Sequence, residues 1–172
     1  NKFQFGLSYY KEGKYDMAIA KYKKSLIYRL EVEDKNGTAV TYNHLGEVYI
    51  KVDSLNKAYK YLQKALKISQ EINVPQDEML AYVGLGHYYE KTKQYDKAIA
   101  YYDRAVKLAK ETGDLGPKME AHNGLYQSYR SLNNFKLALY NHEDYYVLHD
   151  STNKVESRKQ IANLGAKFEV EQ

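Results

Sequence analysis

The sequence has no cysteine, no tryptophan and only two prolines, and it lacks any long hydrophobic run. The missing cysteines exclude disulfides and thiolate metal sites, and they fit the cytoplasm and the periplasm equally. No apolar run approaches the roughly 18–20 residues that a membrane-spanning helix needs, and no signal peptide is recognisable. The chain begins at Asn1 within a helical pattern. We therefore expect a piece of a longer protein, which would meet a membrane only through segments outside it.

A concentration of charge of one sign is also missing. The formal net charge is +4 over 172 residues, and Lys and Glu are interspersed along the chain. Nucleic-acid-binding domains carry a basic patch or stripe. We therefore expect that this chain does not bind nucleic acid.

No group of residues in the sequence predicts catalysis or a metal site. The pair His142-Glu143 begins a zincin-type His-Glu-X-X-His motif, but Tyr146 stands where the second histidine is required. His142 and His149 could share a helical face near Asp150, but two histidines with one loose carboxylate are weak support for a metal. The glycines form no phosphate-binding loop. We expect a non-catalytic protein without metal or cofactor.

What the sequence does contain is a repeat with a period of 40 residues. The positions that keep this step are Tyr9, Tyr49, Tyr89 and Tyr129; Ala18, Ala58, Ala98 and Ala138; Phe5, Leu45, Leu85 and Leu125; and Tyr15, Leu55, Tyr95 and Phe135. The pattern predicts one all-α array of four helix pairs, in about residues 1–37, 38–75, 76–115 and 116–151, with a closing helix over 152–172. The common repeat of this kind has about 34 residues, and we attribute the longer period to longer second helices.

Turn residues agree with this division. Gly13 is predicted to turn the chain within repeat one, and Asn36-Gly37-Thr38 is predicted to break the helical pattern, with Thr38 as an N-cap. Pro75 and Pro117 stand where the first turn of a helix tolerates proline. Both prolines of the chain therefore fall at predicted repeat boundaries.

Repeat three shows the motif most fully. Its first half carries Tyr82, Leu85, Gly86 and Tyr89, and its second half carries Tyr95, Ala98, Tyr102 and Ala105. This order resembles the tetratricopeptide repeat (TPR), in which an aromatic, Leu-Gly and Tyr are followed by Ala, an aromatic and Ala. The resemblance implies a TPR-like α-solenoid in a right-handed superhelix, whose first helices line a concave groove.

Repeat four departs from the pattern. Tyr126 occupies the glycine position, and Tyr145 occupies the position held by Ala65 and Ala105. Large side chains would overpack a close helix crossing, so we expect the last pair to splay or to pack against the C-terminal segment.

That C-terminal segment carries the signals of one more helix. Residues Ser151–Asn153 are predicted to cap it, with Glu156 as capping-box partner. The stripe of Ile161, Leu164, Gly165 and Phe168 would then cover the open apolar side of repeat four.

The resemblance also implies a binding surface on the first helices. The corresponding positions are Asn43, Glu47 and Ile50 in repeat two, Val83, His87 and Glu90 in repeat three, and Asn123, Gln127 and Arg130 in repeat four. Amides, an imidazole and charges of both signs suit an extended peptide or protein segment. The alternative, that these are only solvated polar positions, stays open. Glu47 and Glu90 bring negative charge, so we do not expect the carboxylate clamp of chaperone adaptors.

The segment Lys159–Gln172 resembles the helix that closes TPR sensor regions in bacterial membrane-anchored signalling proteins, which are histidine kinases or DNA-binding regulators. This resemblance implies the sensor or interaction region of a larger signal-transduction protein, placed in the periplasm. The alternative is a free-standing cytoplasmic scaffold or adaptor. A homodimer is open under either interpretation.

Overall fold

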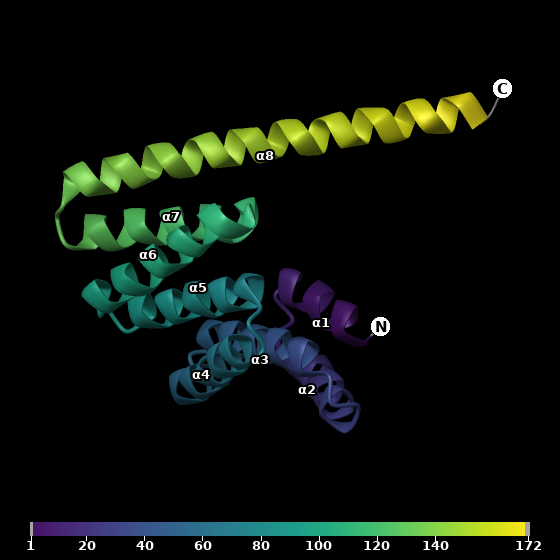
Figure 1. Cartoon of the computed structure of the whole chain (residues 1–172), viewed down its shortest axis with the longest axis horizontal. Coiled ribbons are helices and arrows are strands. Elements are labelled where there is room, and N and C mark those ends of the chain that lie inside the picture. The colour runs from purple at the N-terminus through teal and green to yellow at the C-terminus, as the bar shows by residue number, and fades with distance from the viewer. Residues whose placement is uncertain (1, 171–172) are drawn as a thin grey trace.

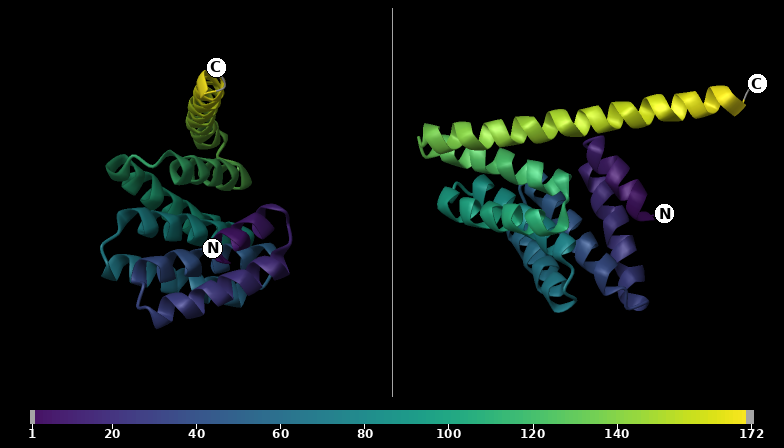
Figure 2. Two further views of the ribbon diagram at one scale, coloured as in Figure 1. Left: turned by 90° about the vertical axis from the view of Figure 1, so that its right-hand side faces the viewer. Right: turned by 45° about the horizontal axis from the view of Figure 1, so that its top comes forward.

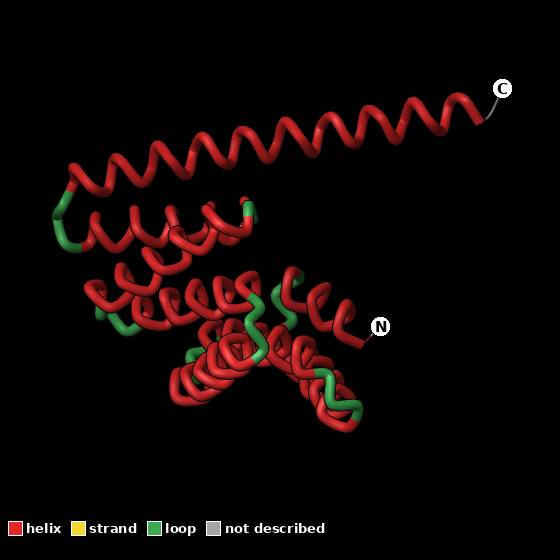
Figure 3. Tube along the Cα trace, in the orientation of Figure 1, coloured by secondary structure: helices red, strands yellow, loops and turns green. Residues whose placement is uncertain are grey.

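The computed structural model describes the backbone of residues 2–170, and the side chains of residues 3–151, 153 and 154. This part of the chain forms eight helices and no strand (Figures 1 and 3). They are α1 (Lys2–Lys11), α2 (Tyr15–Glu31), α3 (Lys35–Lys51), α4 (Leu55–Glu71), α5 (Pro75–Lys91), α6 (Tyr95–Thr112), α7 (Leu115–Ser131) and α8 (Phe135–Val170). None of the described helices combines the length and the apolar character that crossing a membrane requires.

The helices stack as antiparallel pairs. Each helix packs on the next along the chain, and α3, α5 and α7 also contact one another in series. Figures 1 and 2 show the pairs layered from α2 at one end to α8 at the other. This arrangement confirms the prediction of an all-α solenoid built from four helix pairs.

First and second helices of equal length, joined by turns of one kind, explain the period of 40 residues. Helices α3, α4, α5 and α7 all have 17 residues. The prediction that longer second helices lengthen the repeat is therefore wrong, because the first helices match them. The turn inside each repeat is closed in the same way, by backbone N–H groups that donate to the carbonyls of Tyr9, Tyr49, Tyr89 and Tyr129 over 2.8, 2.8, 2.8 and 2.9 Å.

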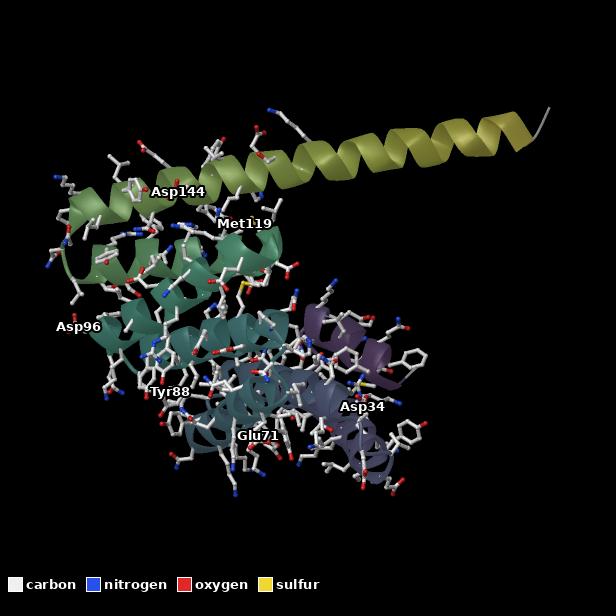
Figure 4. All side chains as sticks on the ribbon, in the orientation of Figure 1. Asp34, Glu71, Tyr88, Asp96, Met119 and Asp144 are labelled. Carbon is white, nitrogen blue, oxygen red and sulfur yellow. The ribbon has the colours of Figure 1, made fainter. Side chains whose placement is uncertain are left out.

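The start of α3 differs from the prediction. Asp34 is the N-cap residue, and its carboxylate accepts a hydrogen bond of 2.8 Å from the Gly37 backbone N–H (Asp34 is labelled in Figure 4). Asn36-Gly37-Thr38 therefore lies inside the helix, and Thr38 does not cap it. An aspartate three residues before an available N–H caps as well as a threonine does, so the sequence offered two candidates. Pro75 is at the start of α5 as predicted.

The predicted closing helix is not separate. Helix α8 continues from Phe135 to Val170, so the capping of a new helix at Ser151–Asn153 is wrong. The Ser151 hydroxyl instead donates to the Val147 carbonyl over 2.8 Å, one turn back along the same helix. Without glycine or proline, this segment does not interrupt α8. The side chains of the predicted stripe Ile161, Leu164, Gly165 and Phe168 lie outside the described residues.

The core repeats one packing unit. Tyr102 of α6 is fully buried, and its ring fills the space that a Cβ atom would need at Gly86 of α5 and at Gly124 of α7. Leu62 of α4 is held in the same way, 2.5 Å from the Cβ position of both Gly46 and Gly84. In α4 and α6, one large side chain of the second helix is thus packed between glycines of two successive first helices. We call this unit the glycine clamp.

In repeat four, the large side chain stands on the first helix and the smaller one on the second helix. Tyr126 stands at the glycine position, and its ring centroid lies 4.8 Å from that of His142, which stands where Tyr102 is in repeat three. His142 is exposed, whereas Tyr102 is buried. The large side chain is therefore on the first helix, and His142 does not enter a clamp.

The glycine clamp makes a testable prediction. Replacing Gly86 with alanine should lower the free energy of unfolding by up to about 2 kcal/mol, because overpacking costs about 1–3 kcal/mol and alanine returns about 1 kcal/mol of helix propensity. Denaturant unfolding followed by circular dichroism measures the change. Gly116→Ala in α7 is the matched control, since no atom lies within 4 Å of its Cβ position. Equal stability of the two variants would contradict the clamp.

Candidate binding groove

A groove of about 870 Å³ lies on the side of the array formed by the first helices. Its lining residues are Leu7, Tyr10 and Lys11 of α1; Asn43, His44, Glu47, Ile50 and Lys51 of α3; Leu80, Val83, His87, Glu90 and Lys91 of α5; Lys93 and Tyr95; and Glu120 of α7. Six predicted positions are therefore brought together here: Asn43, Glu47, Ile50, Val83, His87 and Glu90.

The three predicted positions of repeat four lie elsewhere. Asn123 and Arg130 are exposed on α7 and Gln127 is half-buried, and none of them lines the groove. Arg130 instead lines a smaller hollow of about 270 Å³ between α7 and α8. The register places residues on a helix, but the curvature of the stack decides which helices share a groove.

The groove also contains residues that were not predicted. Tyr10 belongs to the same 40-residue register as Ile50 and Glu90, so the repeat itself could have identified it. Leu80 and Glu120 form a register one turn earlier on the first helices. Extending the predicted stripe by one helical turn would have found both.

An ion pair joins two of the repeats at the groove. The His87 Nδ1 atom lies 3.0 Å from Oε1 and 3.2 Å from Oε2 of Glu47, with the side chains 31% and 18% exposed. Burial lowers the pKa of His87, but the charge and hydrogen bond of Glu47 outweigh burial and raise the pKa to about 9. Burial raises the pKa of Glu47, and the His87 charge more than compensates, so that this pKa is lowered. Both partners are therefore charged at neutral pH.

His44, the other groove histidine, behaves in the opposite way. Burial lowers its pKa, and the charge of Arg29 lowers it further, although Glu47 acts against both. Its ring stacks on Tyr22 with centroids 5.4 Å apart. His44 is thus a neutral packing residue, while His87 is a cation.

Asn43 lines the groove, but its amide oxygen is buried and, within the described part of the chain, unpaired. Its side chain is 6% exposed, and its Oδ1 atom has no hydrogen-bond partner among the described residues. Buried amide groups usually have a partner, because an unpaired one costs about 1–3 kcal/mol. This oxygen lies against α5, beside the Cβ position of Gly84, so Asn43 can meet a group in the groove only through the rest of its side chain.

Charge is distributed unevenly over the groove. Glu47, Glu90 and Glu120 surround His87, whose pKa all three raise. Lys11, Lys51, Lys91 and Lys93 supply positive charge in the same lining. Glu90 also accepts a hydrogen bond of 2.8 Å from the Tyr102 hydroxyl, which ties the groove to the core. No cluster of three or more possible metal ligands occurs among the described residues.

The Glu47–His87 pair makes stability depend on pH. The folded pKa of His87, about 9, lies above the ordinary value of 6.5, so its contribution is complete below about pH 6 and disappears as the pH rises through 9. The difference in unfolding free energy between the natural protein and His87→Gln should therefore be larger at pH 6 than at pH 10, by about 1–3 kcal/mol. Thermal or urea unfolding at each pH measures it.

A control separates charge from packing in this experiment. His87 also packs edge-on against Tyr102, with centroids 5.8 Å apart, but the loss of that contact does not vary with the charge of the imidazole. In a Glu47→Gln background, His87→Gln should lose most of this pH dependence. A pH-independent difference in the natural background would contradict the assigned protonation.

Comparisons with known proteins agree with the geometry. A tetratricopeptide repeat family model matches residues 2–72 and 77–146. No curated protein sequence matches the chain. Among solved structures, BtubC (BKLC) from P. vanneervenii superposes with a TM-score of 0.72 at 19% identity, over 88% of this chain and 63% of that one. The chain thus spans somewhat less than two thirds of that protein.

Two further structures share the fold. The TPR domain of Arabidopsis FLU gives a TM-score of 0.63 at 21% identity, over 68% of this chain and 98% of that one. The apo form of RapI gives 0.78 at 18% identity, over 92% of this chain and 58% of that one. The structural matches support the fold, and the family model covers most of the residues. The chain therefore belongs to the tetratricopeptide repeat family.

Proposed function

We propose that the groove binds an extended peptide or protein segment without catalysis. The TPR fold is that of a protein-interaction module. The observation that carries the proposal is the charged Glu47–His87 pair, which lines a groove that also offers Asn43, Leu80 and Val83. A peptide backbone supplies N–H and C=O groups for the polar side chains of the groove, and its side chains supply apolar and charged partners.

The dimensions of the groove suit a short extended segment. The groove crosses α1, α3 and α5, and packed helices lie about 8–10 Å apart. Three helices therefore span about 20 Å, which accommodates about six residues at about 3.3 Å per residue. The acidic residues around His87 favour a ligand with a basic residue at that point, and the lysines favour an acidic residue near the rim.

For the biological setting, we propose the sensor or interaction region of a larger bacterial signal-transduction protein. The resemblance of Lys159–Gln172 to TPR sensor regions supports this setting, and its side chains lie outside the described residues. The alternative is a free-standing cytoplasmic scaffold. The parent gene distinguishes the two settings. A stretch that encodes about twenty apolar residues downstream of Gln172 supports a membrane-anchored sensor, and a stop codon directly after Gln172 refutes it.

The groove is tested with peptides selected from a displayed library of random unstructured sequences. Selected peptides should bind Asn43→Ala about five- to thirtyfold more weakly, since losing one or two hydrogen bonds costs about 1–2 kcal/mol. Fluorescence anisotropy with the synthetic peptides measures the affinity. Because Asn43 Oδ1 has no partner among the described residues, the variant should keep the melting temperature of the natural protein.

Asn123→Ala is the matched control. It makes the same change at an exposed position of α7 outside the groove, so its affinity should stay unchanged. Peptides that bind both variants equally would remove the groove from the proposal. Failure to select any peptide would count against the peptide-binding function as a whole.

A further inference from the structure

A second hollow, of about 480 Å³, is lined by α6, α7 and α8 and shares no lining residue with the groove. Figure 1 shows α7 between the other two helices. The lining is apolar at Val106 and Leu125 and acidic at Asp103 and Asp144. Tyr140, which is 62% exposed, stands at its opening. The volume lies in the range of about 300–1,000 Å³ that is usual for small-molecule sites. We call this space the α6–α8 hollow.

In repeat three, tyrosines and cations occupy the equivalent positions. Tyr101 of α6 stacks on Tyr89 of α5, with ring centroids 5.4 Å apart and an interplanar angle of 10°, and its centroid lies 6.1 Å from that of Tyr82. The Arg104 Cζ atom lies 5.3 Å from the Tyr101 centroid and 5.8 Å from the Tyr82 centroid. Lys97 Nζ lies 5.3 Å from the centroid of Tyr89. Stacking and cation–π attraction hold these five residues together, and we call them the aromatic–cation unit.

Repeat two contains the same unit, 40 residues earlier at every position. Tyr61 stacks on Tyr49 with centroids 5.5 Å and planes 1° apart, and its centroid lies 5.7 Å from that of Tyr42. Lys64 Nζ lies 5.2 Å from the Tyr42 centroid, and Lys57 Nζ lies 5.5 Å from the Tyr49 centroid. The aromatic–cation unit is therefore a regular part of the repeat.

Repeat four keeps only one member of the unit. Tyr129 stands in the position of Tyr89, and no other aromatic ring contacts it within the described part of the chain. The other four positions hold smaller side chains, and all five residues line the α6–α8 hollow. The replacements are His122 for Tyr82, Asn141 for Tyr101, Asp144 for Arg104 and Leu137 for Lys97. The hollow therefore lacks a ring beside Tyr129, and it has a carboxylate where the earlier repeats have a cation.

Two carboxylates give the hollow an acidic part. Asp144 Oδ2 lies 3.7 Å from Nδ1 of His122, and the same nitrogen lies 3.0 Å from Asn141 Oδ1. The Asp103 side chain reaches solvent, yet partial burial raises its pKa, although the charge of His122 acts against this. A nearby cation would stabilise such a carboxylate. Lys110, which also lines the hollow, is seven residues from Asp103 along α6, or about 10 Å at 1.5 Å per residue.

We propose that the α6–α8 hollow binds a small molecule that carries an aromatic ring and an ammonium group, an arylalkylamine. The ring stacks on Tyr129, as Tyr101 stacks on Tyr89 in repeat three. The ammonium group pairs with Asp144 and Asp103, and it supplies the positive charge that repeat four lacks. The inference goes beyond the proposed function and does not depend on it, because the hollow and the groove have separate linings.

Binding is tested on the complete 172-residue chain with phenethylamine, tyramine and tryptamine, which all combine the two groups. At least one of them should bind with a Kd of about 1 mM or tighter, and NMR titration should place the shift changes at the α6–α8 hollow. Phenylacetate has the ring with the opposite charge, and butylamine has the cation without a ring. Each should bind at least about tenfold more weakly than the best amine.

Variants assign the two contacts. Asp144→Asn removes the charge at nearly constant size, and it should weaken amine binding about tenfold. Asp96→Asn is the matched control, at an exposed position of α6 outside the hollow, and it should bind normally (Figure 4 labels both aspartates). Asn141→Tyr returns the ring of the earlier repeats to its place beside Tyr129. This variant, checked for folding by circular dichroism, should no longer bind the amine.

Four results would overturn the inference. The first is that none of the three amines binds, and the second is that phenylacetate or butylamine binds as well as the best amine. The third is a set of shift changes confined to the groove, whose glutamates also attract cations. The fourth is undiminished amine binding by Asp144→Asn or by Asn141→Tyr. None of these results bears on peptide binding in the groove, so the proposed function is tested separately.

Discussion

The structure depends on one steric constraint, the packing of a large side chain between two positions that have no Cβ atom. Tyr102 occupies this place between Gly86 and Gly124, and Leu62 occupies it between Gly46 and Gly84. The first glycine of each pair belongs to the same repeat and the second to the next repeat. A single side chain therefore contacts both the partner helix within its pair and the first helix of the next pair.

The same constraint places the polar groups of the groove. The Cβ position of Gly84 lies 3.0 Å from Asn43 Oδ1 and 3.1 Å from Glu47 Oε1, so the missing side chain lets α5 approach these groups on α3. Tyr102 extends from the clamp to donate its hydroxyl to Glu90. Core packing and groove chemistry are therefore coupled, because the residues that hold the helices together also hold the groove side chains in position.

The sequence was sufficient for the fold because this constraint has a simple signature, small and aromatic residues at a fixed step. It was insufficient for features decided by weaker or non-local effects. Asp34 and Thr38 are both acceptable caps, and only the folded turn distinguishes them. Ser151–Asn153 has the composition of a helix start, yet these residues also continue a helix that nothing else interrupts. Asn123 shares the register of Asn43, but the curvature of the array keeps α7 from lining the groove beyond Glu120.

Repeat four shows the result of losing the constraint. The aromatic pairs Tyr42–Tyr61 and Tyr82–Tyr101 of the earlier repeats are replaced by His122 and Asn141, joined by a hydrogen bond of 3.0 Å. The clamp position is also polar, since His142 replaces Tyr102. With Tyr126 at the glycine position of α7 and no further first helix among the described residues, a large aromatic has no space to be buried there, so a residue compatible with water is favoured. The neighbouring Phe135, Leu139 and Tyr146 have not changed in this way. They stay apolar and exposed beside the polar clamp position, so among these four positions of α8 only the residue that would have to enter a clamp has become polar.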